Sequence, residues 1–467
     1  MDLIHHLLKM FLQVAEKVLG LLEGDLDYPS FQLELERLLN ELGKEICREV
    51  MESADAWLRQ NPKEREGWVV QRKDDEKGVL TPFGHMVFRR SYYHNEGIGG
   101  YAHLVDLAAG LQPHAKMDLS VKAKLVSAAT EMSYRKAGKN IWSSGSSNCS
   151  VSGQTVTNTI RKTILDNAEA DDESPKKKVR VLHIQADEDH VSKQSGGTAL
   201  AKLVYTTSGY GVSSSKRKRL TNVHYIAGLY RDNEALCRQV YKSIDNDYDI
   251  DLLEKLYVSG DGAPWIRDLA EYLGAVFLLD KYHINKYIKE CLAFCPELRG
   301  KLWKAVNSFE LGATKSVFRE AKKAARTDAE RERVTKCRRY LIGNWDGIQA
   351  WKDEAPYVIG CSAEGHVSHV LSTRLSSRPM AWSEPGIDQM AKLRAMKANG
   401  ISVENYLLQQ AKPELTLAKA IQHVVPVQRE KLRKVSGEVF DNMPALRGST
   451  WSLRKALRSI SMMVTNT

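Results

Sequence analysis

Apolar positions in the first sixty residues recur with the period of an α-helix. Over residues 3–22 they form a face wider than a surface helix needs, and Gly24 follows the last of them. Residues 29–59 repeat the pattern. The sequence therefore predicts two helices. They are expected to pack either against each other as a hairpin or against a second subunit, and the pattern leaves both alternatives open.

From Gly67 the pattern changes to alternation of apolar and polar residues. Over residues 68–93 this alternation predicts a small antiparallel sheet, with its turn expected at Asp74 to Gly78. Exposed Arg and Tyr side chains on such strands could meet a nucleic-acid backbone, although a solvated face is the simpler expectation.

Helical periodicity returns between residues 104 and 165. One short helix is predicted from Ser133 to Ile141 and another from Val151 to Leu165, where Ser152 is placed to cap the helix. Apolar residues of the second helix are expected to face inward: Val156, Ile160 and Ile164. Its polar and basic residues are expected to face outward: Gln154, Thr155, Asn158, Arg161 and Lys162. Small polar residues followed by Arg and Lys suit a recognition helix in a DNA major groove, so this region is predicted to be helix-turn-helix-like.

Residues 179–283 alternate strands and helices. Strands are predicted at 179–191, 203–205 and 223–230, followed by a helix at 234–244 and a strand, helix and strand over 256–279. The loop before the third strand holds four cations that are candidates for DNA contacts: Lys216, Arg217, Lys218 and Arg219. We expect a five-stranded mixed sheet.

The last strand, helix and strand form a βαβ unit that delivers two carboxylates. Asp261 follows the strand at 256–258 after a Ser-Gly turn, and Asp280 ends the strand at 275–279. The two strands of a βαβ unit run parallel, so their C-terminal ends share one edge of the sheet, where open α/β sheets place their chemistry. Taken alone, Asp261 could equally be a turn residue and Asp280 a helix cap.

These changes of pattern divide the chain into regions. They are an N-terminal helical region at 1–65 that could serve oligomerisation, a small β region at 66–103, a helical DNA-binding region at 104–166, a linker at 167–178, the first part of an α/β core at 179–283, a basic helical insertion at 284–345, the final part of the core at 346–400, and a basic C-terminal region at 401–467. The fold class is α+β and multidomain, with helical and small β regions before a mixed α/β core.

Composition limits which kinds of partner, cofactor and cellular compartment are expected. A formal charge of +10 favours a polyanionic partner, most simply nucleic acid. The seven cysteines are scattered and include no CxxC pair, which favours a reducing compartment. The sequence contains no run of eighteen apolar residues, so no membrane-spanning helix is expected. Neither GxGxxG nor GxxxxGK[ST] follows a strand, so no nucleotide cofactor is expected. The cytosol is the expected location.

Three acidic residues stand out as candidate metal ligands: Asp187 in the first strand of the core, Asp261, and Glu364 near the start of a late helix. Mg²⁺ prefers hard oxygen ligands, so a phosphoryl-transfer site with two Mg²⁺ ions needs about three carboxylates. The pair of ions holds the attacking and leaving oxygens in line.

The motifs HIQADEDHV, YVSGDGAPWI, FLLDKYHINKYI and SAEGHVSHVLSTRLSSRPMAW, in this order, resemble those of bacterial insertion-sequence transposases of the ISLre type. These DDE enzymes are related to the Mutator-type transposases. The resemblance runs over nearly the whole chain and implies a ribonuclease-H-like catalytic core interrupted by a helical insertion.

Carried over by motif, the resemblance implies that Asp187, Asp261 and Glu364 are the three catalytic acids and metal ligands. Asp280 and His283 match the family's C/D-x-x-H motif. Glu364 follows Asp261 by 103 positions, which leaves room for the insertion. Two alternatives stay open. Asp189 shares a strand face with Asp187 and could replace it, and Glu384 is a weaker candidate for the third acid.

The implied activity is Mg²⁺-dependent cleavage at transposon ends followed by strand transfer into target DNA, with Mn²⁺ able to substitute. The implied partners are double-stranded DNA and further copies of the chain on that DNA, and the implied location is the bacterial cytoplasm near the nucleoid. Arg374 and Arg378, four positions apart, would contact phosphates from one helical face if the helix carrying Glu364 extends that far. A structure-selective nuclease on the same fold and a catalytically inactive, domesticated DNA-binding protein are the alternatives.

Overall fold

The computed structural model describes residues 3–97, 99–142, 149–163, 165, 175–211 and 219–410. The chain divides into two compact units, one formed by Met1–Thr159 with Val403–Thr467 and the other by Ile160–Ser402. Helices and a mixed sheet make the chain an α+β protein. No helix in the described ranges is both long and apolar enough to cross a membrane.

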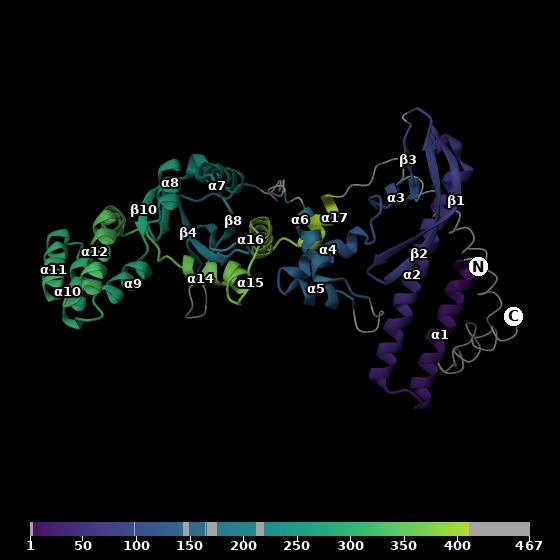
Figure 1. The fold of residues 1–467 in the computed structure, drawn as a ribbon, viewed down its shortest axis with the longest axis horizontal. Coiled ribbons are helices and arrows are strands. Elements are labelled where there is room, and N and C mark those ends of the chain that lie inside the picture. The colour runs from purple at the N-terminus through teal and green to yellow at the C-terminus, as the bar shows by residue number, and fades with distance from the viewer. Residues whose placement is uncertain are drawn as a thin grey trace. The chain divides into compact units, whose positions relative to one another are not determined.

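The first unit begins with a helical hairpin. Helix α1 (Leu3–Glu23) and helix α2 (Tyr28–Gln60) lie side by side (Figure 1). Asp27 starts α2 by accepting a hydrogen bond from the Ser30 backbone N–H at 2.8 Å, and Pro29 occupies the first turn, where its missing N–H costs nothing. The two helices therefore form the intramolecular hairpin that was one of the two expectations.

A three-stranded sheet follows in the order β1-β2-β3, with β1 at Trp68–Thr81, β2 at Gly84–Asn95 and β3 at Tyr101–Ala102. The turn predicted at Asp74 to Gly78 is wrong. Strand β1 runs through those residues as an irregular stretch in which Asp74 has φ 60°, and the turn lies at Pro82 and Phe83, between paired Thr81 and Gly84. Pro82 cannot donate to the ladder and Gly84 has φ 116°, so the chain reverses there.

Short helices complete the first unit: α3 (Leu104–Ala108), α4 (Leu119–Ala129), α5 (Tyr134–Asn140), α6 (Gly153–Lys162, whose last residues belong to the second unit) and α17 (Val403–Gln410). The predicted cap of α6 is confirmed, since Ser152 Oγ accepts from the Thr155 N–H at 3.1 Å. Val156 and Ile160 are buried as predicted, and Ile164 lies outside the described residues.

The second unit is built on a five-stranded sheet, as predicted, in the order β10-β9-β4-β5-β8. Its strands are β4 (Val181–Ser192), β5 (Thr198–Thr207), β8 (His224–Gly228), β9 (Lys255–Gly260) and β10 (Val276–Leu279). Strands β4, β9 and β10 run parallel, while β5 is antiparallel to both β4 and β8. A two-stranded ribbon, β6 (Tyr210–Gly211) with β7 (Arg219–Leu220), lies beyond β5.

Helices cover both faces of this sheet (Figure 1). On one face, α7 (Asn233–Asp247) and α8 (Pro264–Tyr272) bury Val240, Ile244, Ile266 and Leu269 against apolar residues of β4, β5 and β9. At the other face, α14 (Ala363–Val367) contacts β4 and α16 (Glu384–Ala398) contacts β8.

Five helices between β10 and α14 form the insertion. They are α9 (Lys281–Cys291), α10 (Pro296–Asn307), α11 (Leu311–Ala324), α12 (Asp328–Gly343) and α13 (Trp345–Asp353). They enclose a hydrophobic core of their own that includes Ile288, Leu302, Phe318 and Leu341, and this core continues to Leu279 at the end of β10. The insertion is therefore packed directly onto the edge of the sheet where the acids lie.

Candidate metal centre

Strand register brings the predicted acids into one row. Gln185 of β4 pairs with Ser259 of β9, and Gly260 of β9 pairs with Leu279 of β10. The same register continued past the ends of β9 and β10 places Asp187 opposite Asp261 and Asp261 opposite Asp280. The row forms because the three strands run parallel and end at the same edge.

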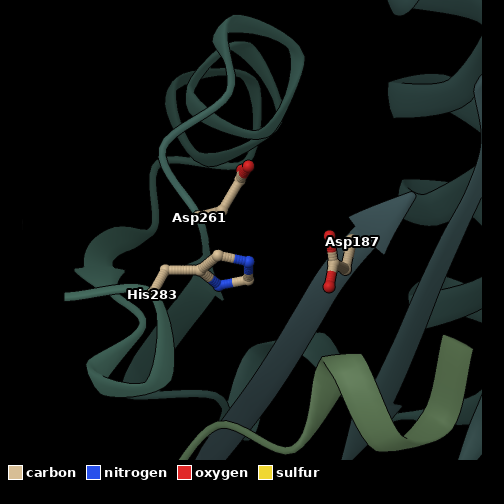
Figure 2. A group of neighbouring side chains, drawn as sticks. All are labelled: Asp187, Asp261 and His283. Carbon is tan, nitrogen blue, oxygen red and sulfur yellow. The ribbon is translucent and has the colours of Figure 1, made fainter. Parts of the chain in front are cut away.

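Asp187, Asp261 and His283 form a tight group. Each offers one ligand atom, and these atoms lie within 4.8 Å of one another. Figure 2 shows the His283 ring pointing toward Asp187, with Asp261 on the adjoining loop. The structure thus brings together two of the three predicted acids and the histidine of the predicted D-x-x-H motif.

Asp187 is a buried carboxylate whose charge is poorly compensated. Its side chain is 6% exposed; Oδ1 accepts from the Glu188 N–H at 2.9 Å, and Oδ2 has no hydrogen-bond partner among the described residues. Burial raises the pKa of Asp187 to about 7; the Glu188 N–H and the charge of His283 oppose this rise, and the negative charges of Asp261 and Glu364 add to it. An unpaired buried oxygen costs free energy, and a bound cation would offset that cost.

Asp261 is held by its own loop and by the insertion. Its Oδ1 accepts from the Ala263 N–H at 2.9 Å, while Gly262 has φ +87° and so permits the tight turn. The Tyr340 hydroxyl of α12 donates to the Asp261 backbone carbonyl at 2.7 Å, and its ring stacks on Tyr287 of α9 with centroids 3.9 Å apart. No local motif signals this role of Tyr340, which depends on packing between distant helices.

Asp280 and His283 act as a pair. Asp280 caps α9 by accepting from the Tyr282 N–H at 2.9 Å, and its second oxygen lies 3.0 Å from His283 Nδ1. That contact orients the ring and leaves Nε2 as the nitrogen available to the carboxylates or to a ligand. Burial by itself would lower the pKa of His283, but the Asp280 hydrogen bond and the nearby charge of Asp187 raise it overall.

Glu364 lies near the group of three but is not part of it. It is an exposed residue in the first turn of α14, close enough for its charge to raise the pKa of Asp187. The chain just before it is fastened to the sheet, because the Ser362 N–H donates to Gln185 Oε1 at 2.7 Å. Gln185 belongs to the quoted motif HIQADEDHV, but the sequence assigned it no role at the site.

The two alternative acids lie elsewhere. Asp189 is buried on the same face of β4 as Asp187, as alternation predicts, but its Oδ1 accepts from Ser376 Oγ at 2.8 Å and it is not in the group of three. Glu384 forms ion pairs with Lys193 at 3.3 Å and with Arg231 at 2.6 Å, and it is likewise not in the group.

The residues predicted to contact DNA differ in how exposed they are, and some lie outside the described residues. Gln154, Asn158, Arg161 and Lys162 are exposed on α6, while Thr155 is half-buried. Gln154 donates to Asn158 at 3.0 Å, and Arg161 donates to Ser383 Oγ at 2.9 Å. Arg219 is exposed at the start of β7; the preceding cations Lys216, Arg217 and Lys218 lie outside the described residues.

The expectation that Arg374 and Arg378 share an exposed helical face is wrong. From α14 the helix continues through a π-helical turn at Ser368–Ser372 and α15 at Thr373–Leu375, and then ends before Arg378. Arg374 is buried, with its guanidinium over the Trp382 ring at 4.7 Å. A cation–π contact with a residue from the following segment therefore takes this side chain out of solvent.

The insertion concentrates positive charge. Residues 281–353 hold 17 Lys and Arg against nine Asp and Glu, so they carry eight of the ten excess positive charges of the chain. Lys322, Lys323 and Arg326 are exposed around the end of α11, and none of the three forms an ion pair with another described residue. A polyanion is the partner that such a surface favours.

Comparison with known proteins shows a family without an assigned function. The family model described as "Uncharacterised protein family (UPF0236)" matches residues 24–412. Two UPF0236 proteins of Caldanaerobacter subterraneus subsp. tengcongensis are each 37% identical to the chain, over 382 and 390 residues. These alignments cover 81% and 83% of the chain and 80% and 82% of the relatives. A UPF0236 protein from the vanSb 3′ region of Streptococcus gallolyticus is 23% identical over 348 residues, or 72% of the chain and 75% of that protein.

Proposed function

This chain belongs to the uncharacterised protein family UPF0236, and we propose that it is a metal-dependent DNA transposase that cleaves insertion-sequence ends and joins them to target DNA. The observation that carries the proposal is the grouping of Asp187, Asp261 and His283 within 4.8 Å at the C-terminal edge of a mixed sheet. Two carboxylates converging on one point, one buried and one half-buried, supply the oxygen donors that Mg²⁺ or Mn²⁺ prefers.

The order of the strands supports a ribonuclease-H-like core. Strands β4, β5 and β8 follow one another as an antiparallel meander, and β9 and β10 are added parallel to β4 on its other side. The first acid lies on the first strand, the second after the fourth strand, and the third on a helix beyond a helical insertion. This is the order of acids expected of a DDE transposase with an interrupted core.

The charge of the insertion supports DNA as the substrate. Its eight excess positive charges lie on helices packed against the strand that delivers Asp280. DNA phosphates would be drawn to this surface and so toward the carboxylates, which are themselves unsuited to bind a polyanion.

The names of relatives support a mobile element. One Caldanaerobacter relative carries eleven locus designations in its name, and another carries four. Multiple loci for one protein in a single organism are what a self-copying element produces.

The residues divide the proposed chemistry among them. Asp187 and Asp261, with Glu364, would hold the cations, and bound cations supply activation of the nucleophile and neutralise the charge that develops on the reacting phosphate. Water attacks the phosphodiester at the element end and the P–O3′ bond breaks. The freed 3′-hydroxyl then attacks a phosphodiester of target DNA, whose own P–O3′ bond breaks and leaves a 3′-hydroxyl on the target strand. His283, oriented by Asp280, would present Nε2–H as a hydrogen-bond donor for a phosphate oxygen when the ring is protonated, a state that its raised pKa favours.

The test combines the purified full-length chain with labelled DNA that carries the flanks of its own gene, in Mg²⁺ or Mn²⁺. We expect a cut at one defined position and joining of the cut end to new DNA, with both products reduced by a factor on the order of 10³ or more in Asp187→Ala. Cutting without joining of pre-cut ends would instead identify a nuclease. Tight, salt-sensitive DNA binding without any cut would identify a domesticated DNA-binding protein.

A further inference from the structure

A row of polar side chains crosses the sheet one step behind the acids. Ser259 of β9, Gln185 of β4, Tyr205 of β5 and Tyr225 of β8 are register partners, so all four project from the same face. Gln185 and Tyr205 are fully buried, and Ser259 is 1% exposed. Asp187 is two residues after Gln185 on the same strand and therefore projects from that face too.

The Gln185 amide grips the segment that leads into α14. Its Nε2 donates to the Gly360 carbonyl at 3.0 Å, and its Oε1 accepts from the Ser362 N–H at 2.7 Å. A backbone carbonyl only accepts and a backbone N–H only donates, so these two contacts fix the orientation of the amide. The two contacts join residues 175 and 177 positions apart, so they form only when the segment before α14 packs against β4.

Tyr205 and Tyr225 complete the attachment. The Tyr205 hydroxyl donates to Gln185 Oε1 and lies 2.9 Å from Ser362 Oγ. Its ring stacks on His366 with centroids 4.3 Å apart, and the Tyr225 hydroxyl lies 2.7 Å from His366 Nδ1. Glu364 is thereby bracketed, with an anchored residue two positions before it and another two positions after it.

We propose that Gln185 is a positioning residue that sets the distance between Glu364 and Asp187. This inference rests on the proposed function, because it assigns Glu364 a role at the metal centre. One strand carries both Asp187 and the amide that fastens the start of α14, so the exposed Glu364 carboxylate is located relative to Asp187 by a short, buried connection. A displacement of about 1 Å at such a site is enough to lower a rate by roughly 100-fold.

Gln185→Met tests the proposal, because Met has a similar length and no amide. We expect the rate of DNA cleavage to fall about 10- to 100-fold while the KM for DNA and the melting-temperature shift caused by Mn²⁺ change little, since Asp187 and Asp261 remain. In Glu364→Asp, where the carboxylate is already withdrawn by one methylene, the same Gln185 substitution should cost at most a few-fold more. Full multiplication of the two losses would overturn the proposal, because it would show that Gln185 acts independently of Glu364.

Tyr205→Phe provides a second and milder perturbation of the same attachment. Its matched control is Tyr248→Phe, which removes a buried hydroxyl that donates to the Asn222 carbonyl at 3.1 Å, away from α14. We expect Tyr205→Phe, but not Tyr248→Phe, to lower the cleavage rate without changing the KM for DNA.

Hydrogen exchange separates failure of this inference from failure of the proposed function. In Gln185→Met, the backbone amides of residues 362–366 should exchange faster than in the unmodified chain, while those of α7 and α8 should not. Unchanged exchange at 362–366 would overturn the positioning role whether or not the protein cuts DNA. Faster exchange in a protein that cuts no DNA would leave the attachment supported and the transposase proposal rejected.

Discussion

Asp187 combines burial with a mixed electrostatic neighbourhood, in which the charge of His283 opposes those of Asp261 and Glu364. Its pKa is raised to about 7, with burial as the main cause, and Oδ2 has no hydrogen-bond partner within the described residues. Burying this carboxylate costs free energy that an apolar side chain at the same position of β4 would not cost, so a purely structural role explains Asp187 poorly. The proposed role as a ligand of a cation would offset this cost.

The raised pKa predicts how stability depends on pH. Because the folded-state pKa lies above the unfolded value of about 3.9, the favourable state of Asp187 is the protonated one; stability is full below pH 4 and is lost as the pH rises through about 7. Without divalent cations, the free energy of unfolding of Asp187→Asn minus that of the unmodified chain should therefore increase by roughly 2–4 kcal/mol as the pH rises from 4 to 8.

Urea unfolding of both proteins at pH 4, 6 and 8 in EDTA measures this dependence. Asp251→Asn, on an exposed carboxylate, is the control and should show no comparable trend. A stability difference between Asp187→Asn and the unmodified chain that stays constant across this range would contradict the assigned pKa.

At the scale of elements, the insertion does more than separate Asp261 from Glu364 in the sequence. Helix α12 fixes the Asp261 loop through the Tyr340 hydroxyl, and Tyr340 in turn stacks on Tyr287 of α9, the helix that carries His283. The insertion thus contacts the supports of two of the three grouped residues. Its packing and the geometry of the site are linked.

Tyr340→Phe tests this link, because it removes the hydrogen bond to the Asp261 carbonyl and keeps the stacked ring. We expect weaker Mn²⁺ binding and a DNA cleavage rate about 10-fold lower, with DNA binding retained. Tyr230→Phe is the matched control, since it removes a hydroxyl that donates to Gln239 at 2.6 Å, far from the acids in the sheet. Equal effects of the two substitutions on metal binding would show that Tyr340 contributes only general stability.

Across the whole molecule, positive charge is distributed very unevenly. The insertion carries eight of the ten excess charges, and Lys322, Lys323 and Arg326 are exposed cations within it. Such a distribution favours DNA binding by the insertion, independently of the α6 residues proposed from the sequence.

Replacing Lys322, Lys323 and Arg326 together by Ser should weaken DNA binding and reduce its dependence on salt. If all three bind phosphates, the slope of log K against log salt should fall in magnitude by about 0.9 for each phosphate that is no longer neutralised. Lys336→Ser is the control, because Lys336 is already paired with Glu332 at 2.8 Å. Fluorescence anisotropy over a KCl series measures both slopes, and an unchanged slope in the triple variant would exclude this surface as a DNA-binding surface.

Much of the fold follows from local patterns. Helical periodicity predicted α1 and α2, and alternating strands with a βαβ unit predicted the five-stranded sheet. The shared edge of Asp261 and Asp280 followed as well, because parallel strands connected by one helix must end at the same side. The turn of the first hairpin was misplaced, since Asp74 and Gly78 favour a turn locally while the pairing of β1 with β2 continues through them.

The sequence by itself determined which residues are chemically suited to the proposed site: Asp187, Asp261, Asp280 and His283. Each motif that holds them is a short stretch of consecutive residues and can therefore be identified without the fold. Only the tertiary structure decided that Arg374 is buried under Trp382, that Tyr340 supports Asp261, and that Gln185 fastens the chain before Glu364. Periodicity and turn chemistry are properties of a few consecutive residues. These supporting interactions join residues 8 to 177 positions apart, and they exist only once separate elements have packed together.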